Sequence, residues 1–131
     1  MVAAGDQLGN RMTVEVIGRS ALGRDMYGVV FNALDTPQQQ RDYNRWVQWR
    51  GIALEDPARA QALLDRWGGD IKVPVYVQGA IHGNEYEGVE SNMQLIEELA
   101  TTPNGVNPKF DDILDHVILV FNVIQNPDGR V

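Results

Sequence analysis

The sequence lacks several features that would point to particular classes of protein. None of its 131 residues is cysteine, which excludes disulfide frameworks, cysteine zinc fingers and thiol nucleophiles. Eleven Lys and Arg stand against 18 Asp and Glu, so the net charge of −7 is the wrong sign for nucleic acid or an anionic membrane. No apolar run is long enough to span a bilayer, and residues 1–10 have neither the basic start nor the apolar stretch of a signal peptide.

What is present fits one ordinary soluble domain. Hydrophobic residues make up 44% of the chain, and Gly and Pro are dispersed along it, so a real core can be buried. Residues 13–19 alternate around Val14 and Val16, and a short turn leads to residues 26–33, which are rich in Val and aromatics. This pattern predicts an antiparallel hairpin at the start of the chain.

Residues 35–70 differ in composition from the segments around them and are expected to form a helical insertion on the sheet. Pro37 opens one segment, and Asp56 followed by Pro57 caps and starts another, which ends at Gly68. In the second segment, one helical face carries Ala60, Leu63, Leu64 and Trp67. The three tryptophans of the region are either a recognition surface or a satellite core, and packing is the commoner role at such spacing; they are Trp46, Trp49 and Trp67.

The rest of the chain predicts a parallel βαβ unit. Residues 73–81 and 117–124 are almost continuously apolar, which is typical of buried parallel strands. Between them, residues 85–100 place Val89, Met93 and Ile96 on one helical face. The predicted fold class is therefore α/β, a mixed sheet that combines the first hairpin with this unit.

Two polar segments are expected at the carboxyl ends of the parallel strands, where open sheets collect ligands. Residues 79–85 follow the first strand and residues 125–130 follow the second. In the first segment His82 and Glu85 are three residues apart, so their side chains can converge on one metal ion. Taken alone this spacing is common, and a capping Glu beside an exposed His is the plainer interpretation.

A catalytic zinc site usually has three protein ligands and an open position. The other histidine, His116, precedes the last strand, so it is expected at the opposite end of the sheet, roughly 25 Å from His82. Asp111, Asp112 and Asp115 are expected to form a solvated helical turn at that far end. Neither Ser20 nor Ser91 has the context of a nucleophilic serine, and no Gly-rich phosphate loop is present.

Two motifs in order carry a resemblance to a known family. The first runs from Gly79 to Gly88 and contains His82-Gly83-Asn84-Glu85, and 44 positions after His82 comes the second, Asn126-Pro127-Asp128-Gly129-Arg130. Together they resemble the N-terminal part of zinc carboxypeptidases of the carboxypeptidase A type. The opening around Ser20 and Arg24 is also similar to the start of that catalytic domain. The resemblance covers most of the chain except residues 35–70.

The resemblance implies a role for each motif. His82 and Glu85 would be two ligands of Zn²⁺, and residues 126–130 a loop that shapes the cleft beside them. In this family a further histidine ligand, the substrate-binding arginines and tyrosine, and the general-base glutamate follow the second motif. Those catalytic residues are therefore expected beyond Val131, and residues 1–131 are expected to be a partial catalytic domain that is inactive alone. Glu87 and Glu90 are expected to be surface carboxylates of the helix rather than catalytic groups.

Two alternatives stay open at this point. One is the related deacylase branch, which shares the His-Gly-Asn-Glu motif and acts on small N-acyl amino acids, although Asn126 to Arg130 favour the peptidase branch. The other is a non-catalytic binding or assembly module that keeps half a metal site. An apolar edge at residues 117–124 predicts that the chain forms a homo-oligomer or pairs with a missing complementary segment. Peptide is the substrate implied by the resemblance, and a mostly secreted family favours a location outside the cytoplasm.

Overall fold

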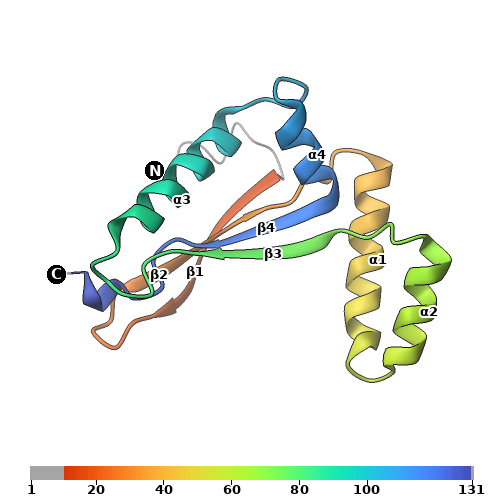
Figure 1. Ribbon diagram of the computed structural model, residues 1–131, viewed down its shortest axis with the longest axis horizontal. Coiled ribbons are helices and arrows are strands. Elements are labelled where there is room, and N and C mark those ends of the chain that lie inside the picture. The colour runs from red at the N-terminus through yellow and green to blue at the C-terminus, as the bar shows by residue number, and fades with distance from the viewer. Residues whose placement is uncertain (1–10, 131) are drawn as a thin grey trace.

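Four strands form one mixed sheet in the computed structural model, which describes residues 11–130 (Figure 1). Their order across the sheet is β1-β2-β4-β3. The β1–β2 and β2–β4 pairs are antiparallel, and the β3–β4 pair is parallel. The predicted fold class, an α/β mixed sheet with an N-terminal hairpin and a parallel pair, is confirmed. The strands are β1 (Met12–Arg19), β2 (Asp25–Phe31), β3 (Val73–Gln78) and β4 (Val117–Asn122).

A helical hairpin connects β2 to β3, as the sequence predicts, and projects beyond one end of the sheet (Figure 1). Helix α1 (Pro37–Ala53) begins at Thr36, whose hydroxyl accepts a hydrogen bond from Gln39 N. Helix α2 (Pro57–Trp67) begins at Asp56, whose carboxylate accepts from Arg59 N. It ends at Gly68, which has a left-handed φ of 66°. Whether residues 35–70 are an insertion in the evolutionary sense stays a prediction.

Two helices separate β3 from β4, where the sequence analysis anticipated one. Helix α3 (Tyr86–Thr101) lies along one face of the sheet and buries Val89 and Leu99 in the core (Figure 1). Helix α4 (Pro108–His116) extends the expected polar turn to nine residues, with Asn107 accepting from Lys109 N at its start. Its Leu114 is buried with Phe31 and Phe121, whose rings meet edge to face.

The expectation that residues 73–81 form a buried strand is wrong. Strand β4 lies between β2 and β3, so within residues 11–130 β3 is an edge strand with one neighbour, and most of its side chains are exposed. The related expectation that residues 117–124 form the edge is wrong for the same reason. Strand order depends on contacts between distant segments, which an apolar pattern does not record.

The register shows which backbone hydrogen-bonding groups of the edge strand β3 are paired with β4. Gly79 N donates to the carbonyl oxygen of Asn122, so backbone groups at alternate residues of β3 face β4. Those of Pro74, Tyr76 and Gln78 therefore face away from it. Proline has no N–H to lose at such a position, which accounts for a proline within this strand.

No helix within residues 11–130 combines the length and the apolar character needed to cross a membrane. The expectation about a signal peptide concerns residues 1–10, which lie outside the described residues.

Candidate metal centre

The segment that follows β3 turns sharply at the carboxyl end of the strand. Ala80 has a φ of 53°, a left-handed conformation that residues with a side chain seldom adopt. Two residues later the chain closes a β-turn, in which Glu85 N donates to the carbonyl oxygen of His82 over 3.1 Å. This turn brings the first and fourth side chains, His82 and Glu85, to the same side.

The two predicted ligands meet. Nδ1 of His82 donates to Oε1 of Glu85 over 2.8 Å, and the side chains are 75% and 54% exposed. The hydrogen bond from His82 is the largest cause that holds the pKa of Glu85 below its ordinary value, so Glu85 is a carboxylate at neutral pH. Glu85 is the N-cap residue of α3, but its side chain makes no capping bond. The plainer interpretation, a capping glutamate, is therefore wrong.

The pair fits zinc in chemistry and nearly in separation. Imidazole nitrogen and carboxylate oxygen are ordinary zinc ligands, and two ligands of a tetrahedral ion lie roughly 3.4 Å apart. An opening of roughly 0.6 Å would admit the ion between Nδ1 and Oε1. Within residues 11–130, however, no three His, Cys, Asp or Glu side chains are grouped so that they could hold a metal. Among the described residues, His82 and Glu85 are therefore a pair of candidate ligands without a third.

The expectation that the catalytic residues lie beyond Val131 stays a prediction. Val131 itself is outside the described residues, which end at Arg130. Among residues 11–130, the carboxylates nearest in sequence to the pair are Glu87 and Glu90, both exposed on α3. The ligand roles of His82 and Glu85 therefore stay predictions, and the general base stays unassigned.

The second predicted segment packs directly on this turn. Gln125 N and Asn126 N donate to the carbonyl oxygens of Gly79 and Ala80 over 2.8 and 3.0 Å. A 3-10 turn, η3 (Pro127–Gly129), follows, and Asn126 caps it by accepting from Gly129 N. A Cβ on Gly83 would overlap the backbone carbonyl group of Gly129, so only glycine fits at position 83.

A third segment reaches the same edge, and sequence reasoning did not assign it there. The turn between β1 and β2 contacts η3, because β2 runs antiparallel to β4 and so begins where β4 ends. Ser20 Oγ donates to Asp128 Oδ1 over 2.7 Å, and Arg24 Nη1 donates to the carbonyl oxygen of Pro127 over 2.5 Å. The available signal was the similarity of this turn to the start of a carboxypeptidase domain.

His116 lies at the other end of the parallel strands, as predicted. It is the last residue of α4, and β4 begins at the next residue, whereas His82 follows the end of β3. Its Nδ1 donates to the backbone carbonyl oxygen of Asp112 over 2.8 Å and lies 3.5 Å from Oδ1 of that residue. His116 therefore does not contribute to the centre at His82 in this chain.

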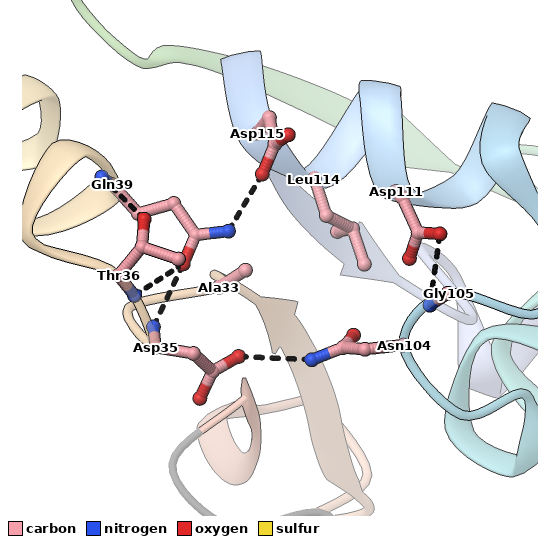
Figure 2. Close-up of a pocket in the computed structure, with 9 residues that line it drawn as sticks. All are labelled: Ala33, Asp35, Thr36, Gln39, Asn104, Gly105, Asp111, Leu114 and Asp115. Carbon is pink, nitrogen blue, oxygen red and sulfur yellow. Dashed lines mark hydrogen bonds between the residues drawn. The ribbon is translucent and has the colours of Figure 1, made fainter.

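A pocket of about 200 Å³ lies near that far end and collects three carboxylates (Figure 2). Each carboxylate already accepts a hydrogen bond. Asp111 accepts from Gly105 N, Asp115 from Gln39 Nε2 and Asp35 from Asn104 Nδ2, at 3.0, 2.6 and 3.2 Å. The pocket is thus a packed junction between α1, α4 and the segment before α4 rather than a metal centre.

The tryptophans of the helical hairpin are packed against its own arginines. Arg45 lies over the ring of Trp67 and Arg50 over that of Trp46, at 5.5 and 4.8 Å from the ring centroids. The side chains of Trp46, Trp49 and Trp67 are all partly buried. This arrangement supports the satellite-core interpretation over a recognition surface.

The carboxyl edge of the sheet thus carries a strand-to-helix turn with a converged His–Glu pair, and the turn after the neighbouring parallel strand packs against it. The family model described as zinc carboxypeptidase matches residues 1–131, so the chain belongs to the zinc carboxypeptidase family. No curated protein and no solved structure gives a significant match to the chain. The family assignment makes the chain a zinc carboxypeptidase-like domain of a hydrolase family, and the ligand roles of His82 and Glu85 remain predictions.

Proposed function

We propose that this chain supplies His82 and Glu85 as zinc ligands of a carboxypeptidase that hydrolyses C-terminal peptide bonds. The observation that carries the proposal is the 2.8 Å contact between Nδ1 of His82 and Oε1 of Glu85 at the carboxyl edge of the sheet. The membership of the chain in the zinc carboxypeptidase family supports it. When bound, Zn²⁺ supplies Lewis-acid chemistry, polarising a carbonyl oxygen and acidifying water.

In this proposal the residues of the chain bind the zinc ion and orient its ligands. Both ligand side chains are exposed, so a peptide can approach them from solvent. Gly83 removes any side chain between the ligands and the η3 turn. Of the helix carboxylates considered above, Glu90 lies 3.8 Å from the guanidinium of Arg130, which stacks on Tyr86. This pairing supports a surface role for Glu90 rather than a role as general base.

We also propose that the 131-residue chain is inactive by itself. Two ligands hold zinc loosely, and a third ligand from outside residues 11–130 would close the coordination. The purified chain is expected to release no C-terminal amino acid from peptides and to hydrolyse no N-acyl amino acid. Chelator-sensitive release of either product that depends on His82 would contradict this, and the product would separate the peptidase hypothesis from the deacylase hypothesis.

Zinc binding tests the ligand assignment. The chain is expected to bind one Zn²⁺ weakly, as measured by competition with a chromophoric chelator, and His82→Ala is expected to abolish the binding. His116→Ala is the matched control, because His116 is equally exposed and also lies beside a carboxylate. Binding that survives in the first variant, or that falls equally in both, removes His82 from the site.

We further propose that two copies of the chain pair through β3. Tyr76 and Gln78 direct backbone donors and acceptors away from β4, and Val73 and Tyr76 are 51% and 56% exposed. A strand with free backbone groups and apolar side chains is a template for its own copy, which would join antiparallel across a two-fold axis. That arrangement places the two His82 residues at opposite ends of β3, so each centre keeps its open coordination.

Sedimentation tests the pairing. The chain is expected to form dimers at high concentration, and Tyr76→Lys is expected to weaken them because a charged side chain blocks edge pairing. Tyr27→Lys is a matched control, since Tyr27 is 51% exposed but belongs to β2, which has a neighbour on each side. A monomer at all concentrations, or equal loss in both variants, argues against the β3 interface.

A further inference from the structure

One carboxylate joins the two ends of the described chain at the carboxyl edge of the sheet. Asp128 Oδ1 accepts from Ser20 Oγ over 2.7 Å, and Asp128 Oδ2 accepts from Leu22 N over 3.0 Å. Both oxygens are thus occupied by donors from the β1–β2 turn, more than 100 positions earlier in the sequence. A two-point attachment of this kind fixes the orientation of the carboxylate as well as its position.

Arg24 reinforces this attachment. Its Nη1 donates to the carbonyl oxygen of Pro127, and its Nε lies 3.9 Å from Asp128 Oδ1. Ser20 also accepts from Arg24 N over 3.0 Å, so the same hydroxyl organises the turn and contacts Asp128. The hydrogen bond from Ser20 is the largest cause that holds the pKa of Asp128 below its ordinary value. The charged form of Asp128 is therefore the form that the fold favours.

The other side of η3 packs against the turn that carries the candidate ligands. Gly129 packs on Gly83 so closely that a Cβ added to Gly129 would lie 3.1 Å from the Cα of Gly83. Asn126 N ties the start of η3 to the carbonyl oxygen of Ala80. The η3 turn is consequently held between two segments, the β1–β2 turn on one side and the turn that carries His82 and Glu85 on the other.

We propose that Asp128 is a positioning residue for the metal centre: by anchoring η3 to Ser20 and Leu22, it keeps Gly129 against Gly83 and so fixes the turn that presents His82 and Glu85. The inference rests on the proposed function in taking these two residues as ligands. Asp128 itself touches neither of them and is not a ligand. Its effect is transmitted through the backbone contact between the two glycines.

The first arm of the test measures zinc affinity on the whole chain, with Zn²⁺ alone as the probe in chelator competition. Asp128→Asn places an amide N–H₂ group opposite a donor, either Ser20 Oγ or Leu22 N. It is expected to weaken zinc affinity on the order of tenfold, the size of effect seen when groups that orient metal ligands are lost. Asp65→Asn is the matched control, because Asp65 accepts a side-chain bond from Gln61 on α2, away from this edge. Unchanged affinity in Asp128→Asn overturns the proposal.

The second arm separates positioning from general stability. Ser20→Ala removes a donor with little change in shape and is expected to weaken zinc affinity severalfold, less than Asp128→Asn. The double variant is expected to match Asp128→Asn alone, since Ser20 acts through Asp128. If the losses of zinc affinity add up in the double variant, the contact is merely structural. The same conclusion follows if zinc affinity falls in proportion to the urea midpoint in both Asp128→Asn and Asp65→Asn.

The third arm is independent of the metal. Hydrogen exchange of the Glu85 and Asn126 amides, both bonded across these turns, is expected to speed up on the order of tenfold in metal-free Asp128→Asn and to stay unchanged in Asp65→Asn. If His82→Ala leaves zinc binding intact, the proposed function fails while this arm still reports whether Asp128 holds the turn. Unchanged exchange in Asp128→Asn contradicts the positioning role whatever the fate of the zinc assignment.

Discussion

Two histidines of this chain each lie beside a carboxylate, one at each end of the parallel strands. His82 and Glu85 are 2.8 Å apart, and His116 and Asp112 are 3.5 Å apart. All four side chains are more than half exposed, and both pairs span about one turn of chain. By residue type, spacing and exposure the two pairs are nearly equivalent.

The backbone around each pair makes the difference. His116 ends a helix, and its Nδ1 bonds to the carbonyl oxygen one turn earlier, so the ring is used by the helix itself. His82 lies in a turn after a strand, and the neighbouring turn η3 packs on Gly83, which lies between His82 and Glu85. The comparison teaches that two His–carboxylate pairs of similar spacing can differ in how the backbone around them is restrained, and spacing alone does not reveal that restraint.

Gly83→Ala should have the largest effect, because it removes the backbone restraint that distinguishes the His82 pair from the His116 pair. The new Cβ would meet the backbone of Gly129, which has no flexible end that can move aside. We expect a loss of about 3 kcal/mol in the free energy of unfolding by urea and the loss of zinc binding. Gly51→Ala is the control, because Gly51 lies within α1 with nothing near its Cβ position, and it should stabilise the chain by about 0.5–1 kcal/mol. Wild-type zinc affinity in Gly83→Ala would show that the two glycines need not touch.

Lys72→Met should sharpen the comparison of the two His–carboxylate pairs, because it changes the end of the sheet at which His116 lies. Lys72 is fully buried near the His116 end, and its Nζ donates to the carbonyl oxygens of Ala33 and Leu114 over 2.7 and 2.5 Å. Burial is the main cause that lowers its pKa. Loss of the donor leaves two buried acceptors without a partner, so we expect about 2 kcal/mol less stability in urea and no change in zinc affinity per folded molecule. A drop in zinc affinity would mean that the two ends are coupled.

Acid should produce the smallest effect, and only at the His82 end. The fold holds the pKa of Asp128 below its ordinary value of 3.8, so its stabilisation is complete above that pH and is lost as the pH falls through the folded value. The difference in Tm between the wild type and Asp128→Asn should therefore be largest near neutral pH and shrink below about pH 4. A difference that is constant between pH 7 and pH 3 would contradict the charge-dependent contact.

Local signals predicted most elements of this fold. Asp56, Pro57 and Gly68 mark the limits of α2, and each has the capping role that its chemistry favours. The β1–β2 hairpin and the face of α3 followed from periodicity in the same way. These features depend on residues within a few positions of one another, so the sequence pattern records them directly.

The missed features all depend on distant partners. The exposure of β3 follows from the insertion of β4 beside β2, and the role of Ser20 follows from its contact with Asp128, 108 positions away. Lys72 could not be recognised as a buried residue, because its two acceptors come from the segment after β2 and from α4. For the candidate centre, the pair His82 and Glu85 was predicted, and the turns that restrain it were only partly predicted.

The strand order has a consequence for how the chain folds. Strand β4 is the last of the four strands to be synthesised, yet it is the one that joins β2 to β3. Until it emerges from the ribosome, the hairpin and β3 have no shared partner, and the apolar groups that they bury later stay exposed. We therefore expect cooperative structure among these four strands to arise in one step, when β4 enters the sheet. Because that step closes long loops, it should be slow and vulnerable to aggregation.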